Sequence, residues 1–232
     1  MSSSKPRPRM TAEKRRHAIL QASLPLFAQH GQNGVTTLEL AKACGVSEAL
    51  LFRHFPTKQA MFDAILLHQI SQVKPGYPQI SPASTSTEDL VRLVCLFVHY
   101  VVFTNATADR EVMRLFYRSF VDDGSFARAF LSGERVQQIR RDFEAGLAEA
   151  RRTGDAQALA TVPHNLFWFV QHATTAACLM RLPPQPVIKY RGALTAAIHD
   201  LVRFALRGVG LTDEALARYA TNERFDRWLA GR

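Results

Sequence analysis

The stretch "TTLELAKACGVSEALLFRHFPTK", residues 36–58, decides the fold because it predicts two short helices joined by a tight turn. Thr36 and Glu39 have the Thr-x-x-Glu spacing of a capping box, which marks the start of a helix. Gly45 supplies the turn, and Ser47 is a favourable N-cap for the next helix. The sequence therefore predicts a helix, a glycine turn and a second helix.

A longer helix is expected in front of this pair. Apolar residues recur with a helical period from Thr11 to His30, and Gly31 follows as a C-terminal stop. In the last predicted helix, Leu51 and Phe55 are four residues apart and share one inward face, and Pro56 ends the helix. Together the three segments predict a helix-turn-helix with a small core.

Positive charge is concentrated in this part of the chain. The 232-residue chain has a formal net charge of +9 and a pI of about 9.9. Residues 1–58 hold nine lysines and arginines against three acids. This balance favours a polyanionic partner, which is a nucleic acid, a membrane surface or an acidic protein.

The remainder of the chain predicts an all-α protein with a second, larger helical domain. Residues 1–10 are expected to be a flexible basic arm, 11–57 the helix-turn-helix domain, 58–73 a connecting helix and 88–232 the C-terminal domain. A Pro/Ser/Thr-rich linker separates the last two. The helices expected in the C-terminal domain lie near Glu88–Thr104, Asp109–Asp122, Ser125–Arg152, Pro163–Leu182, Val187–Leu206 and Thr212–Ala230.

Other composition signals favour a cytoplasmic, non-enzymatic protein. Cys44, Cys95 and Cys178 are odd in number and far apart, which fits neither a disulfide framework nor a Cys-x-x-Cys site. The N-terminus lacks the apolar run of a secretory signal, and the most apolar segment, residues 93–103, is too short to span a bilayer. No membrane partner, metal or cofactor is expected. An enzyme using His99, His172 or Cys95 is the alternative class, but no catalytic set or phosphate loop accompanies them.

The residues "TTLELAKACGVSEALLFRHFPTKQAMFDAIL" resemble the N-terminal DNA-binding domain of the tetracycline-repressor (TetR) family of bacterial transcription regulators. The resemblance extends from about Thr11 through the connecting helix. It implies a recognition helix that enters the major groove of operator DNA. Two positions depart from the family pattern, since Ala49 stands where Gly or Pro is common and Phe52 where Tyr is common.

The residues expected to contact DNA are Thr37, Ser47, Glu48, Ala49, Leu50, Phe52, Arg53, His54 and Lys58. Arg53 is a candidate for bidentate binding to guanine or for a phosphate contact. Glu48 could accept from a cytosine amino group or serve only the helix dipole. The resemblance implies that Thr37 and Lys58 bind backbone phosphates.

Further contacts are expected at the edges of this surface. His54 is another expected phosphate donor, and Leu50 could touch a thymine methyl group. Phe52 cannot donate a hydroxyl group, so its ring is expected to pack on a sugar or a base methyl group. The basic arm with Lys5, Arg7 and Arg9 could reach along DNA or serve only as a solubilising tail.

The C-terminal domain is expected to bind a ligand and to form the dimer. Aromatic residues with polar neighbours predict a pocket for a small, largely apolar or aromatic effector, although such residues are more often core. These residues are His99, Tyr100, Phe103, Arg118, Trp168, Gln171 and His172. Small-residue stripes, which the resemblance also places at a four-helix dimer seam, are Ala173, Ala176, Ala177, Ala193, Ala196 and Ala197.

These features predict a homodimeric repressor that binds a palindromic operator in double-stranded DNA and is released by the ligand. The alternative is a DNA-bound regulator whose C-terminal domain docks another protein, with an exposed apolar patch in place of a closed chamber. A redox role for Cys95 or Cys178 is disfavoured by their apolar surroundings.

Overall fold

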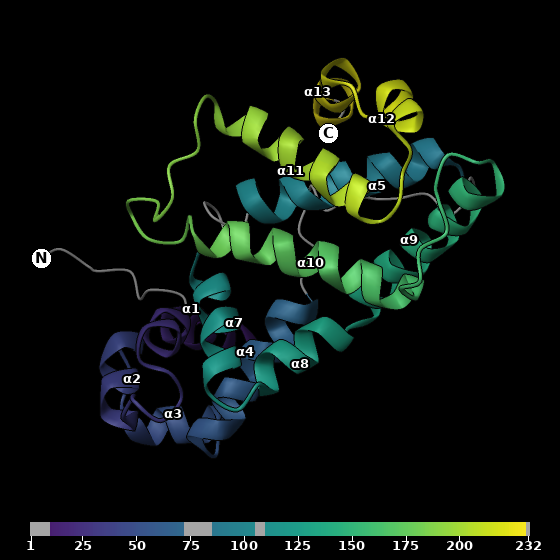
Figure 1. The fold of residues 1–232 in the computed structure, drawn as a ribbon. Helices are drawn as coiled ribbons and strands as arrows, with labels where there is room; N and C mark the ends of the chain where they lie inside the picture. Colours follow the sequence, from purple (N-terminus) through teal and green to yellow (C-terminus); the bar gives the residue numbers. More distant parts are fainter. Residues whose placement is uncertain (1–9, 72–84, 105–109, 231–232) are drawn as a thin grey trace, which may run out of the picture. The chain divides into compact units, whose positions relative to one another are not determined.

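The computed structural model describes residues 10–71, 85–104 and 110–230, and within these ranges the regular structure is helical apart from an isolated antiparallel bridge between Ala156 and Leu211. The predicted all-α class is therefore confirmed. The chain divides into two compact units (Figure 1). Unit 1 comprises Met1–Gln72 and Arg114–Phe126, and unit 2 comprises Val73–Met113 and Ala127–Arg232.

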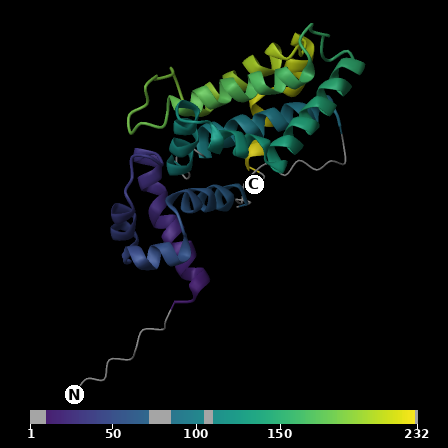
Figure 2. The same ribbon diagram turned by 90° about the horizontal axis from the view of Figure 1, so that it is seen from below.

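Unit 1 contains α1 to α4 and most of α7. Their bounds are Ala12–His30, Thr37–Cys44, Glu48–His54, Lys58–Ser71 and Arg110–Val121. The long α1 packs against α2 and α4, and the short α3 lies beside α2 (Figure 2). The aromatic ring of Phe27 meets that of Phe62 edge to face at 5.4 Å, and Leu40, Leu51 and Phe55 are buried beside the helix-turn-helix.

The turns of unit 1 follow the predicted capping residues. The hydroxyl oxygen of Thr36 accepts a hydrogen bond from the backbone N–H of Glu39, and the Glu39 carboxylate accepts one from the backbone N–H of Thr36. The predicted capping box is therefore confirmed. Gly45 adopts the left-handed conformation with φ of 63°, and the Ser47 hydroxyl accepts from the backbone N–H of Leu50. The sequence thus fixes both ends of the turn that positions α3.

Helix α7 contributes a side chain to the C-terminal end of α1 within unit 1. Arg118 Nη1 donates to the carbonyl oxygen of Gln29 at 3.1 Å, and Arg118 Nε lies 3.5 Å from Asp122 Oδ2. Gly31, which follows α1 with φ of 71°, leaves the space that the guanidinium occupies. A helix 80 residues further along the chain therefore completes the end of α1.

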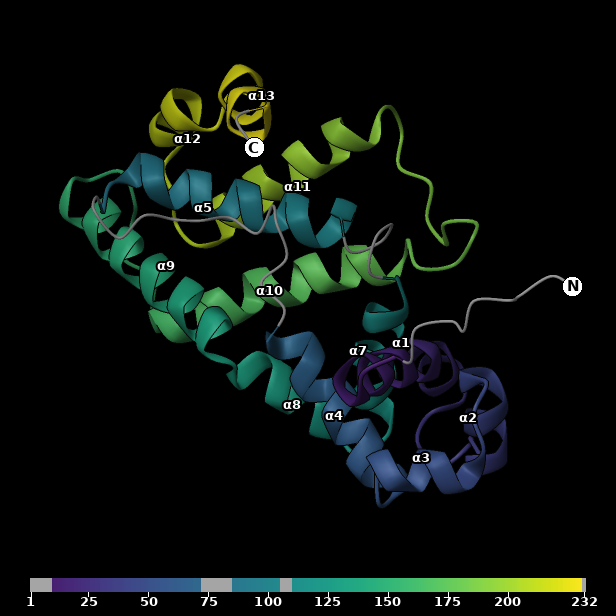
Figure 3. The ribbon, with the colours of Figure 1, turned by 180° about the vertical axis from the view of Figure 1, so that it is seen from behind.

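Unit 2 is built around α5. Its elements are α5 (Thr87–His99), the π-helix η1 (Tyr100–Thr104), most of α8 (Ser125–Ser132), α9 (Glu134–Arg152), α10 (Pro163–Leu179), α11 (Leu194–Gly208), α12 (Asp213–Tyr219) and α13 (Asn222–Ala230). Helix α5 packs against α9, α11, α12 and α13, which lie around it in Figure 3. The apolar segment 93–103 thus supplies the centre of a protein core. Among the described residues, no helix is both long and apolar enough to cross a membrane.

Three of the predicted helices of the C-terminal domain were wrong in extent. The segment Ser125–Arg152 is two helices separated at Gly133, and Thr212–Ala230 is two helices separated at Ala220. There the hydroxyl group of Thr221 accepts from the backbone N–H of Arg224 and starts a new helix.

The segment predicted as Val187–Leu206 begins as a helix only at Leu194. Three prolines precede it in "LPPQPVIKYRG", and Gly192 has φ of 81°, so this segment is not helical. Helix α10 likewise ends at Leu179, before these prolines.

Candidate nucleic-acid interface

The predicted DNA-contact residues lie at the start of α2, along α3 and at the start of α4. Ser47, Ala49, Phe52 and Arg53 are exposed. The other five are half-buried, namely Thr37, Glu48, Leu50, His54 and Lys58. Helix α3 therefore has one face that is exposed and an opposite face on which Leu51 is buried, as a helix that enters a DNA groove from a small core requires.

Two of these residues bind each other. The Thr37 hydroxyl donates to Glu48 Oε2 at 2.6 Å, which joins the first turn of α2 to the first turn of α3. The hydroxyl proton of Thr37 is thereby used, so the donor left for a phosphate at this position is its backbone N–H in the first turn of α2. Glu48 sets the position of α3 through this bond and keeps a second oxygen for other partners.

Lys58 lies close to the start of α2. Its ammonium group donates to the carbonyl oxygen of Val35 at 2.9 Å, just before the capping residue of α2. An ammonium group has three donors, so two remain for a phosphate oxygen. Lys58 and the N-terminal turn of α2 are thus adjacent cationic and N–H donor groups.

Arg16 of α1 is a functional candidate that no sequence motif indicates. Its Nη1 donates to the carbonyl oxygen of His54 at 2.6 Å, and its guanidinium lies over the Phe55 ring at 4.1 Å from the ring centre. It therefore binds the C-terminal end of α3 from another helix. No local pattern distinguishes Arg16 from its basic neighbours in the sequence, because both partners are 38 or more residues away.

An apolar rim accompanies the polar groups. Phe52 is 41% exposed on α3, and Leu38, which is not among the predicted contact residues, is 50% exposed on α2. Exposed apolar side chains beside N–H donors suit contacts with sugars and base methyl groups. The surface thus offers polar and apolar groups together.

Local environment shifts the pKa of three groups in unit 1. Hydrogen bonds from Thr36 lower the pKa of Glu39, which favours the charged form of the capping carboxylate. Burial raises the pKa of Cys44, whose thiol lies near Ser23. Burial, and secondly the nearby His17, lowers the pKa of His68, and the two imidazole rings lie 4.8 Å apart between α1 and α4.

The seven residues predicted to line a ligand pocket fall in both units. Arg118 binds α1 within unit 1, as described above. His99 stacks on Phe103 at 5.1 Å between ring centres, and Trp168 Nε1 donates to His164 Nε2 at 2.9 Å. Tyr100 and Gln171 are buried and His172 is exposed. A shared pocket formed by these side chains remains a prediction.

The predicted dimer residues lie on α10 and just before and within α11. Ala176, Ala193 and Ala196 are exposed, Ala173 and Ala197 are half-buried, and Ala177 is buried. They remain predicted contacts.

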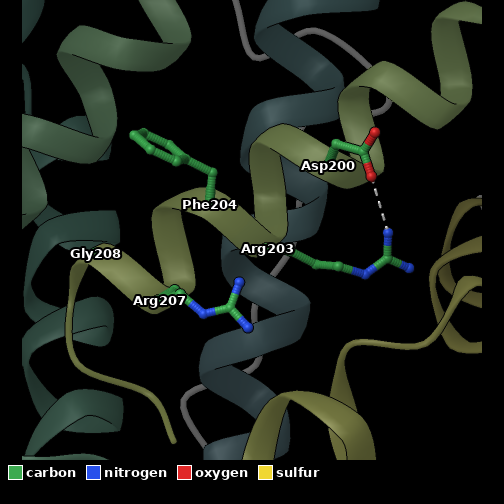
Figure 4. A pocket seen from close by; sticks show the side chains of 5 residues that line it. All are labelled: Asp200, Arg203, Phe204, Arg207 and Gly208. Carbon is green, nitrogen blue, oxygen red and sulfur yellow. Dashed lines mark hydrogen bonds and ion pairs between the residues drawn. The ribbon is translucent and has the colours of Figure 1, made fainter. Parts of the chain in front are cut away.

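Large apolar side chains are exposed on the same two helices. Helix α10 has no Asp, Glu, Lys or Arg along its 17 residues, yet Phe169 is 56% exposed and Leu179 is 39% exposed. On α11, Phe204 is 69% exposed (Figure 4). Exposed apolar surface of this kind marks interaction sites.

Comparison with known proteins places these features among bacterial regulators. Residues 19–65 match the family described as "Bacterial regulatory proteins, tetR family". The nucleoid occlusion factor SlmA of Actinobacillus pleuropneumoniae serotype 5b (strain L20) is 32% identical over 159 residues, which are 66% of this chain and 77% of that protein. SlmA of Salmonella paratyphi B is 47% identical over 92 residues, 39% of this chain and 46% of that protein.

Solved structures share the fold at lower identity. A tetR-family regulatory protein from Rhodococcus RHA1 has a TM-score of 0.63 and 20% identity, covering 86% of this chain and 99% of that one. AibR, solved in complex with isovaleryl coenzyme A and operator DNA, has a TM-score of 0.59 and 18% identity. The match covers 83% of this chain and 97% of that one. These likenesses show a shared fold over most of the chain.

Proposed function

Because this chain belongs to the TetR family of DNA-binding bacterial regulators, we propose that it is a homodimeric repressor that binds a palindromic operator and is released by a small apolar or aromatic ligand. The observation that carries the proposal is the arrangement of α2 and α3 in unit 1. There Arg53 is exposed on α3, while Lys58 and the first turn of α2 offer adjacent donors for a phosphate.

In the proposed complex, α3 lies in the major groove and the start of α2 lies against the backbone. Arg53 reads guanine or binds a phosphate, and Lys58 binds a phosphate with the donors that Val35 leaves unused. Glu48 holds the two helices together through Thr37, and Arg16 holds the other end of α3. Helices α2 and α3 and the Lys58 ammonium group are thus held in place before DNA arrives, which lowers the ordering cost of binding.

The short length of the recognition helix α3 is the reason to expect a dimer. A helix of 7 residues contacts few base pairs, so two copies on a two-fold operator are needed for tight and specific binding. The charge-free α10 and the exposed apolar residues of α10 and α11 support a dimer contact on these helices. We assign to the same contact the predicted alanines that are not buried, namely Ala173, Ala176, Ala193, Ala196 and Ala197.

Release requires that the ligand binds the DNA-incompetent arrangement more tightly. Helix α7 is a covalent connection through which a change in unit 2 can reach α1. Its first residues belong to unit 2, and Arg118 near its other end binds the last turn of α1. A ligand that shifts α7 would remove the hydrogen bond from Arg118 to Gln29 and loosen the helix that carries Arg16. The regulator acts in the cytoplasm in this proposal.

A second candidate function is a DNA-bound regulator whose C-terminal unit docks another protein without a small inducer. The relative with 32% identity over 77% of its length is named a nucleoid occlusion factor. The exposed apolar side chains of unit 2 are available to a protein partner as well as to a second copy. DNA binding by unit 1 is common to both candidates.

Operator binding tests the shared part of the proposal. DNA bound by the full chain would be selected from random sequence, and its affinity measured by fluorescence anisotropy at several salt concentrations. We expect Arg53→Ala to change the preferred bases or to weaken binding by about tenfold. Lys58→Ala should weaken binding to every sequence and reduce the salt slope by about 1 per site.

The control is Arg141→Ala, which removes an exposed positive charge from α9 in unit 2. Equal losses in Arg141→Ala and Lys58→Ala would refute the assigned surface. With a selected operator in hand, a compound that lowers its affinity supports the repressor, whereas a protein that binds the operator complex and leaves operator affinity unchanged supports the second candidate.

A further inference from the structure

Two histidines face each other where α1 packs on α4 in unit 1. His17 of α1 and His68 of α4 meet edge to face, with 4.8 Å between the centres of their imidazole rings. Imidazole is the side chain whose charge changes between about pH 5 and 8. The contact between these two helices therefore contains a pair of groups that both gain positive charge as the pH falls.

The neutral form of His68 suits this contact. His68 is half-buried, and its Nε2 lies 3.4 Å from the amide nitrogen of Gln21, which is one turn along α1 from His17. An amide N–H can donate to that ring nitrogen only while the nitrogen carries no proton. Protonation of His68 therefore removes an acceptor and places a charge in a half-buried contact, opposite a second imidazole.

The described charged groups around this pair do not favour a proton on His68. Among the described residues, α1 makes the most extensive contact with α4. The ionisable side chains one turn before His17 on α1 are Glu13 and Lys14, which are exposed and opposite in charge. On α4, His68 has no ionisable neighbour within four positions in the sequence. Burial, and secondly the nearby His17, lowers the pKa of His68, in agreement with this geometry.

The same two helices carry groups that hold the DNA-reading surface in place. Arg16, next to His17 in α1, donates to the carbonyl oxygen of His54 at the end of α3. Lys58, the first residue of α4, donates to the carbonyl oxygen of Val35 just before α2. A change in the packing of α1 on α4 therefore moves Arg16 relative to Lys58, and with them the ends of α3 and α2.

We propose that the His17–His68 pair is a proton-controlled switch of operator binding, in which uptake of a proton by the pair separates α1 from α4 and weakens the binding of operator DNA. The inference rests on the proposed function of unit 1 and adds its regulation. The proton acts as a ligand that prefers the separated arrangement, because His68 regains water and moves away from the second imidazole when the helices part.

The direction of the pH dependence follows from linkage. Because the pKa of His68 is lowered in the packed arrangement, the separated arrangement binds the proton at the higher pH. The packed arrangement is therefore fully favoured above the ordinary histidine pKa of about 6.5 and loses population as the pH falls below that value. Operator affinity falls with it.

Ordinary electrostatics predicts the opposite trend. His54 on α3, a predicted phosphate contact, also gains charge at low pH, and added positive charge next to DNA strengthens binding to phosphates. A chain without the switch is therefore expected to bind operator equally well or better as the pH falls. Loss of affinity at low pH thus distinguishes the switch from the general charge of the surface.

Fluorescence anisotropy with a selected operator tests the switch. At constant ionic strength, we expect the full wild-type chain to lose about fivefold or more in affinity between about pH 7.5 and pH 5.5. The double variant His17→Gln/His68→Gln keeps polar side chains at both positions but cannot take up the proton, so this loss should disappear. His30→Gln, at an exposed position on the same helix, is the matched control and should keep the wild-type pH dependence.

Reversing the charge at residue 17 gives a result that loss of structure does not reproduce. In His17→Glu, a carboxylate faces His68 and stabilises its protonated form in the packed arrangement. The pH dependence should then reverse, so that affinity rises as the pH falls, whatever the affinity at neutral pH. Arg141→Ala lowers the net charge equally but in unit 2, and should leave the wild-type pH dependence unchanged.

Proton counting tests the mechanism in the wild-type chain itself. Because operator binding selects the packed arrangement, binding near about pH 6 should release protons, and isothermal titration calorimetry in buffers of different ionisation enthalpy measures their number. The double variant should release none from this pair. Helical circular dichroism that is unchanged between the two pH values would show that the chain stays folded.

The outcomes separate this inference from the proposed function. A chain that binds no selected DNA at any pH would overturn the proposed function, and the switch with it. A wild type that binds operator equally well or better at low pH, or a double variant that keeps the whole loss, would overturn the switch alone. A loss that disappears in the double variant and reverses in His17→Glu would support the switch.

Discussion

Replacing Gly31 with alanine tests how the end of α1 is built. Gly31 has φ of 71° and ψ of 175°, a backbone region that only glycine adopts readily. An added Cβ would lie 2.4 Å from Arg118 Nε and 3.0 Å from its Cζ, so the guanidinium would have to move. The substitution therefore strains the backbone and displaces the side chain that binds Gln29.

The expected cost is the sum of these two effects. The strained backbone accounts for about 1–3 kcal/mol. Losing the hydrogen bond from Arg118 to Gln29 adds about 1 kcal/mol, which is below the usual range of about 1.5–3 kcal/mol for a charged donor because the side chain is 39% exposed. We expect Gly31→Ala to lower the opening free energy of unit 1 by about 2–4 kcal/mol, a large part of a typical domain stability of about 5–15 kcal/mol.

Gly45→Ala is the matched control in the same unit. Gly45 also has a positive φ, 63°, but a Cβ there would meet nothing within 4 Å. Gly45→Ala should therefore lower the free energy of unfolding only by the left-handed backbone penalty of about 1–2 kcal/mol. In an Arg118→Ala background, Gly31→Ala should cost about 1 kcal/mol less than in the wild type, because the displaced hydrogen bond is already absent.

Hydrogen exchange of the α1 and α2 amides measures these values. Both tryptophans, Trp168 and Trp228, belong to unit 2, so their emission should not change and serves as an internal control. The reasoning is refuted if Gly31→Ala costs no more than Gly45→Ala, or if its cost is the same with and without Arg118.

Three further predictions follow from the contacts of unit 1. Arg16→Ala should weaken operator binding by about 1–2 kcal/mol per half-site in anisotropy titrations. Arg16→Lys should not restore binding, because an ammonium group cannot both bind the α3 carbonyl oxygen and stack on the Phe55 ring as a guanidinium does. Full rescue by lysine would show that only the charge matters. Because the pKa of His68 is lowered in the folded state, the unfolded chain binds a proton at this residue at a higher pH than the folded chain does. The neutral His68 therefore contributes its full stabilisation above the ordinary histidine pKa of 6.5. That stabilisation is lost as the pH falls from 6.5 toward the lowered pKa of the folded state. His68→Gln should flatten this part of the pH dependence of α1 and α4 amide protection, and an unchanged pH profile would contradict the assignment. Because burial raises the pKa of Cys44, a thiol reagent at pH 8 should modify it more slowly than free cysteine, and should reach Cys95 and Cys178 only on unfolding; rapid labelling of either buried thiol would contradict the packing.

The helix-turn-helix of unit 1 was predictable because the ends of its helices depend on local chemistry. The capping box at Thr36, the left-handed Gly45 and the N-cap Ser47 each act on neighbours within four residues, and the structure has all three. The helix breaks at Gly133 and Ala220 were missed because apolar periodicity continues across them. Apolar periodicity indicates which face of a segment is buried, but it does not indicate whether the segment is one continuous helix or two.

The contacts within the candidate site were less predictable. The sequence identified Thr37 and Glu48 separately, but their mutual hydrogen bond depends on how α2 and α3 pack. Arg16 was missed because it acts on the end of α3 from α1, and Arg118 was predicted in a ligand pocket whereas its hydrogen bond is to Gln29. Such partners are set by tertiary structure, which a single sequence does not encode in any short pattern.

The position of α13 against α5 has a consequence for the order of folding during translation. Arg224 of α13 binds Glu88 at the start of α5, 136 residues earlier. The segments of unit 1 have all been synthesised once residue 126 has emerged from the ribosome, but the central helix of unit 2 lacks two of its neighbours until the last helices are made. Such non-local pairing is slow to form and leaves apolar surface uncovered meanwhile. A nascent chain stalled before α12 would therefore be a substrate for chaperones even though its DNA-reading unit could already be folded.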